Sequence, residues 1–217
     1  MGQAGTISFT AMGNKGKNMI KNVVFDVGKV LVDFDWQGLM DALGFSAEVC
    51  QKVADAKVLS KLWNEFDRSR MSDDEILDGF LAKAPDYKAE VLKFWDNMGN
   101  SIKQYGYAHS WIRSLKEKGY QVYLLSNYSR RMYSQSIEEL SFVEVDGAIF
   151  SYEVCATKPE LEIYEALLKK YQLDPTECVF LDDNRSNIIA ANQLGMATIH
   201  FHTKAQAEEE LRSLGVQ

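Results

Sequence analysis

The 217-residue chain is predicted to form an α/β fold, a Rossmann-like doubly wound parallel sheet with an α-helical cap inserted after its first strand. Three observations predict this fold. Short apolar runs alternate with stretches of helical periodicity from residue 107 to the C-terminus, as in strand–helix units. Residues 37–104 show only helical patterns. A polar cluster follows each of several apolar runs, where the strands of a parallel sheet would end.

The first strand is predicted at Val23 to Phe25, and it is followed directly by Asp26 and then by Gly28. A second β-rich run, Val30 to Val32, comes next. Ligands of open α/β sheets bind beyond the carboxyl ends of the strands, so Asp26 is predicted to lie where chemistry occurs. An Asp-x-Gly by itself fits a turn cap equally well, and the residues downstream decide between the two.

The segment 37–104 is predicted to be all helical. Ser46 fits a helix N-cap, Ser72 and Glu75 fit a capping box, Pro85 ends a helix, and Gly99 ends the last one. An insertion placed directly after a catalytic strand favours a lid over the active site. Helices that pack on the sheet without any lid function are the alternative.

The alternation resumes after residue 104. Strands are expected at 120–125, 147–150, 178–181 and 197–201, and helices at 109–118, 133–140, from Thr157-Lys158-Pro159 through Leu168, 188–194 and 205–214. The expected organisation is a disordered leader at 1–19, a core domain at 20–36 and 105–217, and a cap domain at 37–104.

Composition excludes several classes of protein. A net charge of −7 and a pI near 5.1 argue against nucleic acid or an anionic membrane as the partner, because both need a basic patch. No apolar run approaches the length of a membrane span. Cys50, Cys155 and Cys178 are widely spaced, which predicts reduced thiols and a cytoplasmic location. Residues 1–19 are polar and Gly-rich and do not fit a signal peptide.

Four polar clusters are expected to converge, because the carboxyl ends of parallel strands share one edge of the sheet. They are Asp26-Val27-Gly28, Ser126-Asn127, Lys158-Pro159, and the run from Asp182 to Asn187. Each cluster by itself fits a turn or a helix start. Their combination in this order is far more specific.

With these motifs the chain resembles hydrolases of the haloacid dehalogenase (HAD) superfamily, with a HAD core and a helical cap. It is most similar to the branch of glucose-1-phosphatase and the N-terminal phosphatase half of soluble epoxide hydrolases. The resemblance implies that Asp26 is the nucleophile of a phosphatase and forms an aspartyl-phosphate. It also implies Mg²⁺ bound by Asp26, the Gly28 carbonyl and Asp183, with Asp182 as a ligand or just behind one.

The same resemblance assigns the remaining motif residues. Ser126 and the amide of Asn127 would bind phosphoryl oxygens, and Lys158 would supply positive charge to the nucleophile and the transferred group. Asn187 would orient the network beside the metal. The expected substrate is a small phosphorylated metabolite, with a sugar phosphate as one candidate, and the oligomeric state stays open.

One position departs from the family pattern. Phosphatases of the superfamily usually carry a second Asp two residues after the nucleophile, where it serves as acid and base, and this chain has Gly28. Water, the substrate, or Asp33 or Asp35 reaching back could supply the proton. Asn184 and Arg185 fit either substrate contacts or a plain helix start, and the helix start is favoured.

Two other functions remain open. A degenerate member that binds phosphate or a partner without turnover is supported by Gly28. A 2-haloacid dehalogenase would also lack that second Asp, but the adjacent carboxylates of Asp182 and Asp183 need a cation and so favour the phosphatase. Four aromatic residues could line a sugar site or, more commonly, belong to the core: Trp36, Trp63, Trp95 and Tyr105.

Overall fold

The computed structural model of the protein describes residues 19–141 and 145–217, so the expected leader lies, apart from Met19, outside the described residues. Five parallel strands form the central sheet in the order β5-β4-β1-β6-β7. Their bounds are β1 Asn22–Phe25, β4 Gln121–Ser126, β5 Gly147–Phe150, β6 Cys178–Asp182 and β7 Ala197–His200. The chain winds from β1 to one side and then to the other, so the topological switch lies between β1 and β6.

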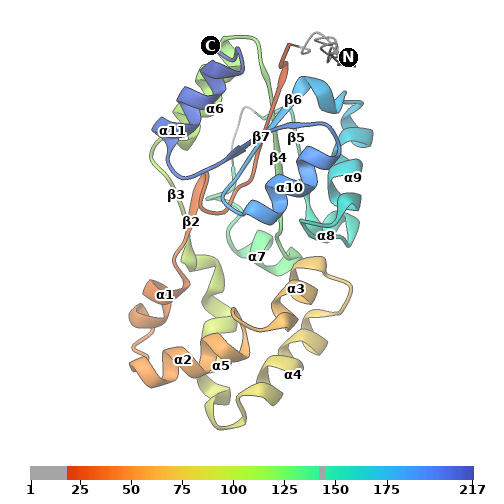
Figure 1. Cartoon of the computed structure of the whole chain (residues 1–217). Coiled ribbons are helices and arrows are strands. Elements are labelled where there is room, and N and C mark those ends of the chain that lie inside the picture. The colour runs from red at the N-terminus through yellow and green to blue at the C-terminus, as the bar shows by residue number, and fades with distance from the viewer. Residues whose placement is uncertain (1–18, 142–144) are drawn as a thin grey trace, which may run out of the picture.

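Helices cover both faces of this sheet (Figure 1). Val23 and Phe25 of β1 pack in the same core as α6 (Ala108–Glu117) and α11 (Lys204–Ser213). Val24, which points to the other face, packs with α9 (Leu161–Tyr171) and α10 (Arg185–Gln193). This alternation, with both faces buried, confirms the doubly wound α/β fold that the sequence predicted.

The helices that lie between β2 and β3 in the chain form a separate layer beyond the carboxyl edge of the sheet (Figure 1). They are α1 Trp36–Ala42, α2 Ala47–Ala56, α3 Lys61–Arg68, α4 Asp73–Lys83 and α5 Lys88–Asn97, with the short 3₁₀ helices η1 Pro85–Tyr87 and η2 Met98–Ser101. Ser72 and Glu75 form the expected capping box at the start of α4. The three rings of Phe66, Phe80 and Trp95 pack against one another in the interior of this layer.

Two short strands join the helical layer to the core, and one of them lies in the segment predicted to be all helical. β2 (Val32–Phe34) pairs in antiparallel fashion with β3 (Ile102–Gln104). Three residues are too few to show a strand period, and their partner lies at the opposite end of the inserted helices. Only tertiary pairing therefore makes Ile102–Gln104 a strand.

Three further elements lie between the core strands. They are α7 Arg130–Gln135, α8 Ser151–Val154 and the 3₁₀ helix η3 Pro175–Glu177. A helix was expected at 133–140, but it begins earlier because Ser129 accepts a hydrogen bond from the amide of Met132 as an N-cap. Within residues 19–141 and 145–217, none of the helices combines the length and apolar character needed to cross a bilayer.

Candidate active site

Strand β1 delivers Asp26 to the carboxyl edge of the sheet. The amide of Asp26 donates to the carbonyl of Leu181 at 2.8 Å, which extends the strand pairing to this residue. The chain then turns sharply, because the Val27 carbonyl accepts from the amides of Leu31 and Val32, and Lys29 adopts a left-handed conformation with φ of 57°. This turn keeps Gly28 beside the Asp26 carboxylate at the edge of the cavity.

Three donors converge on one oxygen of the Asp26 carboxylate. Oδ1 accepts from the Val27 amide at 2.6 Å and from the Ser126 hydroxyl at 2.9 Å, and it lies 2.7 Å from Lys158 Nζ. These contacts fix the orientation of the carboxylate. Among the described residues none donates a hydrogen bond to the other oxygen, Oδ2, which keeps its lone pairs for a metal or for attack on an electrophile.

Lys158 links two buried carboxylates. Its Nζ lies 2.7 Å from Asp26 Oδ1 and 2.7 Å from Asp182 Oδ2, and the residue is 5% exposed. Asn127 holds the backbone of Lys158 from both sides, since its Oδ1 accepts from the Lys158 amide at 2.7 Å and its Nδ2 donates to the Lys158 carbonyl at 3.0 Å. The side chain of Asn127 thus positions the lysine, a role that the sequence did not predict.

The two adjacent acids after β6 have different environments. Asp182 is fully buried and accepts from the Asn184 amide at 2.7 Å and from Asn187 Nδ2 at 3.0 Å, in addition to its ion pair with Lys158. Asp183 is half-buried and lines the cavity. Carboxylate oxygens of Asp26, Asp182 and Asp183 all lie within 4.8 Å of one another, a grouping able to hold a metal ion.

The electrostatics of this cluster favour an added cation. Burial raises the pKa of Asp26 to about 7, with repulsion from Asp182 adding to the effect and Lys158 opposing it. Burial and repulsion from Asp182 also raise the pKa of Asp183. Burial acts to lower the pKa of Lys158, but attraction by Asp182 and Asp26 outweighs it, so the lysine stays charged. One cation facing three carboxylates leaves a negative site that a divalent metal would neutralise.

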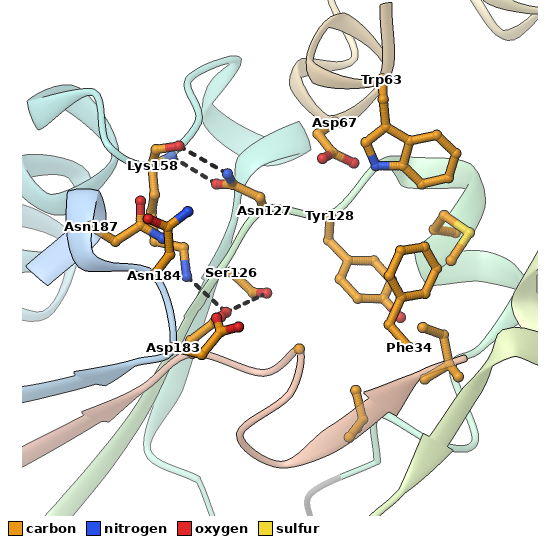
Figure 2. Close-up of a pocket in the computed structure, with 15 residues that line it drawn as sticks. Phe34, Trp63, Asp67, Ser126, Asn127, Tyr128, Lys158, Asp183, Asn184 and Asn187 are labelled. Carbon is orange, nitrogen blue, oxygen red and sulfur yellow. Dashed lines mark hydrogen bonds and ion pairs between the residues drawn. The ribbon is translucent and has the colours of Figure 1, made fainter. Parts of the chain in front are cut away.

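The cluster opens into a cavity of about 210 Å³ between the core and the helical layer. Figure 2 shows the polar groups of the core on one side, and Trp63, Tyr128 and Phe34 on the other. Asp67 descends into the same space from α3. The cavity lining comprises Asp26, Gly28, Val32, Phe34, Trp63, Asp67, Ile102, Ser126, Asn127, Tyr128, Met132, Lys158, Asp183, Asn184 and Asn187.

The structure brings together the residues that the sequence singled out in all four clusters. Seven of them line the cavity: Asp26, Gly28, Ser126, Asn127, Lys158, Asp183 and Asn187. Asp182 lies buried behind them and contacts Lys158 and Asn187.

Other candidates lie elsewhere. Asp33 and Asp35, considered as replacement acids, are not among the cavity residues, and Asp35 caps α1 by accepting from the Gly38 amide at 2.8 Å. Asn184 caps α10 and also lines the cavity, whereas Arg185 is an exposed first residue of that helix.

Among the four aromatic candidates, only Trp63 lines the cavity. Trp95 is 3% exposed and belongs to the interior of the helical layer. Trp36 and Tyr105 do not line the cavity.

Sequence reasoning missed Asp67. This acid is 8% exposed, comes from the last turn of α3 and lines the cavity. Its signal was present, because Trp63, Phe66 and Asp67 recur at the spacing of one helix face, so that an acid stands on an otherwise apolar stripe.

The chain matches the family profile described as haloacid dehalogenase-like hydrolase over residues 20–195. It is 27% identical over 195 residues to a sesquiterpene phosphatase of Aspergillus oryzae, covering 89% of this chain and 96% of the relative. It is 30% identical over 210 residues to the D-ribitol-5-phosphate phosphatase of Bacteroides thetaiotaomicron, covering 89% and 97%.

Among solved structures, a HAD family enzyme of Bacteroides thetaiotaomicron in a magnesium complex shares the fold. The TM-score is 0.71 at 22% identity, over 90% of this chain and 100% of the other. The profile match runs from the residues just before β1 to beyond Asn187, so it includes every motif residue of the cavity. With that span and that fold, the chain belongs to the haloacid dehalogenase-like hydrolases.

Proposed function

We propose that the protein is a Mg²⁺-dependent phosphatase that hydrolyses a small phosphorylated metabolite through an aspartyl-phosphate on Asp26. The observation that carries this proposal is the Asp26 carboxylate, whose Oδ1 is held by three donors while Oδ2 accepts from none of the described residues. The phosphatases among its relatives support the choice of phosphate esters. A reducing, cytoplasmic location fits the three free cysteines.

The donor set suits Mg²⁺, which prefers hard oxygen ligands. Asp26, the carbonyl of Gly28 and Asp183 would hold it. Asp182 is already engaged by Lys158, Asn187 and the Asn184 amide, so it would support the ligands from behind more than bind the ion. When bound, the metal would neutralise charge and polarise the phosphoryl group.

The residues of the chain would perform both chemical steps. The Ser126 hydroxyl, the Asn127 amide and Lys158 would bind the phosphoryl oxygens. The Asp26 carboxylate would attack phosphorus, the ester P–O bond would break, and the leaving oxygen would take up a proton. Water would then give up a proton and attack the same phosphorus as the bond between phosphorus and the Asp26 oxygen breaks, which releases inorganic phosphate and regenerates the Asp26 carboxylate.

The helices of residues 37–104 would act as a cap domain over this site. Phe34, Trp63 and Ile102 give the cavity an apolar wall next to the phosphate-binding groups. A cavity of about 210 Å³ accommodates a small organic group, and a sugar phosphate is one candidate substrate.

The test is phosphate release from p-nitrophenyl phosphate and a panel of sugar and alkyl phosphates, with Mg²⁺ or with EDTA. We expect turnover with Mg²⁺ only, and its loss in Asp26→Asn. Asp78→Asn, which alters an exposed acid on α4, should behave as the wild type. Absence of turnover on every ester, in a protein that binds Mg²⁺ and phosphate, would instead establish the non-catalytic alternative.

A further inference from the structure

Gly28 leaves the core without an acid for the leaving group. A Cβ placed on Gly28 would meet nothing within 4 Å, so an Asp would fit there and its absence has no steric cause. Departure of an alkoxide from phosphorus is slow unless a proton reaches the leaving oxygen. If the proposed function holds, that proton comes from another group facing the cavity, from water or from the substrate itself.

Asp67 is placed to face the leaving group. In an in-line displacement the leaving oxygen lies opposite the nucleophile, which for Asp26 is the side of the helical layer. Asp67 lies at the end of α3 in that layer, and Figure 2 shows its carboxyl group at the cavity, across from Lys158 and Asp183. Burial raises the pKa of Asp67 to about 8, against the opposing charge of Arg68, so the carboxyl holds a proton near neutral pH.

The other titratable groups of the cavity lining are unsuited to this task. Asp26, Lys158 and Asp183 form the cluster on the nucleophile's side. The Tyr128 hydroxyl lies 2.9 Å from Ser136 Oγ, and burial raises the pKa of this phenol further. Asp67 is thus the one titratable side chain that the helical layer contributes to the described lining.

Contacts between the helical layer and the core hold Asp67 in place. Its carbonyl accepts from the Ser151 hydroxyl at 2.7 Å, and the neighbouring Arg68 forms an ion pair with Glu160 of the core. The amide of Arg130 donates to Ser69 Oγ at 3.3 Å. These contacts bind the end of α3 to the core at the cavity rim, so the backbone that carries Asp67 has a defined position.

We propose that Asp67 is the general acid and base of the reaction, in place of the Asp that related phosphatases usually carry at the position of Gly28. In the first step its proton passes to the leaving oxygen as the P–O bond breaks. In the second step the resulting carboxylate takes a proton from the water that attacks the aspartyl-phosphate from the vacated side. Phosphate leaves, and both Asp67 and Asp26 return to their starting states.

The experiment compares p-nitrophenyl phosphate with phenyl phosphate, because the two esters have similar shapes and very different leaving groups. p-Nitrophenolate departs without a proton, whereas phenolate benefits from one. In Asp67→Asn, we expect kcat/KM for phenyl phosphate to fall by about 10²-fold or more, and kcat/KM for p-nitrophenyl phosphate to change only a few-fold. Asp78→Asn on α4 is the matched control.

Rescue provides a second readout. Adding Gly28→Asp to Asp67→Asn should restore phenyl phosphate turnover relative to p-nitrophenyl phosphate, because it returns an acid to the core side. If Asp67→Asn lowers kcat/KM equally for both esters and Gly28→Asp gives no rescue, Asp67 only shapes the cavity. If Asp67→Asn keeps full activity on both esters, Asp67 takes no part in the reaction. Wild type inactive on both aryl esters and on the whole panel of sugar and alkyl phosphates would refute the proposed function itself.

A pH profile of the wild type tests the proposal without any variant. If Asp67 is the acid, kcat/KM for phenyl phosphate falls as the pH rises past its pKa, and p-nitrophenyl phosphate shows a much weaker basic limb. Equal limbs for both esters would contradict the proposal. The fit must include the charged groups at the end of α3 and in the cavity lining. Arg68 acts directly on Asp67 and pairs with Glu65 and Glu160, and the charged lining residues are Asp26, Lys158 and Asp183.

Discussion

At the scale of single residues, Lys158 is the group on which the charge balance of the cavity depends. It is the cation between two carboxylates that are themselves buried, and its backbone is held by Asn127. A buried ion pair adds little stability compared with apolar residues in its place. Removing one partner is nevertheless strongly destabilising, because the other charge stays buried without compensation. Lys158 is therefore expected to affect both the stability of the fold and the proposed reaction.

Lys158→Met should damage both properties. We expect the free energy of unfolding, measured by urea titration in EDTA, to drop by about 3 kcal/mol because Asp26 and Asp182 lose their shared cation. Phosphatase turnover should fall by about 10²-fold or more. Lys52→Met, at an exposed position of α2, is the control, and equal stability of the two variants would contradict the ion-pair argument.

At the scale of the elements, the interior of the helical layer contains an unusual lysine. Lys57 is fully buried, and among the described residues its Nζ has no hydrogen-bond partner. Nζ lies 4.9 Å from the ring centre of Phe80, 4.9 Å from that of Phe94 and 4.7 Å from that of Trp95. Burial lowers the pKa of Lys57 well below its usual value, with Arg131 adding to the effect.

Lys57→Met should stabilise the protein, because loss of the desolvation penalty outweighs the cation–π contacts. The unfolded lysine binds a proton that the folded one resists, so the wild type gains stability as pH rises towards the unfolded pKa. We expect the advantage of the variant in urea titrations to be larger at pH 7 than at pH 10. A less stable Lys57→Met at pH 7 would show that the aromatic contacts dominate.

A second prediction at this scale concerns the ion pair at the end of α3. Arg68 pairs with Glu160 across the boundary between the helical layer and the core, and the Arg68 side chain is 17% exposed. Arg68→Gln and Glu160→Gln should each lower kcat/KM on phosphate esters several-fold by loosening this contact. A double-mutant cycle on kcat/KM should give a coupling energy between Arg68 and Glu160 of about 0.5 to 1 kcal/mol. Additive effects would show that the pair does not hold the layer in place.

At the scale of the whole molecule, the proposed metal site combines residues from segments far apart in the chain. Asp26 follows β1, whereas Asp183 follows β6. An ion bound by both would stabilise the folded state and not the unfolded chain. Binding should therefore appear as a change in melting temperature.

Mg²⁺ at about 100 times its dissociation constant should raise the melting temperature by about 5 to 10 °C over EDTA at matched ionic strength. Asp183→Asn should abolish most of this shift, because it replaces a negatively charged carboxylate of the site by a neutral amide. Asp174→Asn, at a helix cap remote from the cavity, should retain it. A shift of equal size in Asp183→Asn would place the ion elsewhere.

The sequence by itself determined much of this protein. The alternation of apolar runs and helical stretches predicted the doubly wound sheet, since a parallel strand buried on both faces must be apolar throughout. The order of Asp26, Ser126, Lys158 and Asp183 after successive strands predicted that they would meet, because parallel strands share one carboxyl edge.

Tertiary structure alone decided the rest. The sequence could not place Asp67 in the cavity or show that the Asn127 side chain hydrogen-bonds to the Lys158 backbone, because both depend on how separate segments pack. β3 exists through pairing with β2, and Lys57 is buried through the packing of three aromatic rings around it. Periodicity reports which face of an element is apolar. The partner of that face, and the protonation state it imposes on a buried side chain, arise from the packing of distant segments.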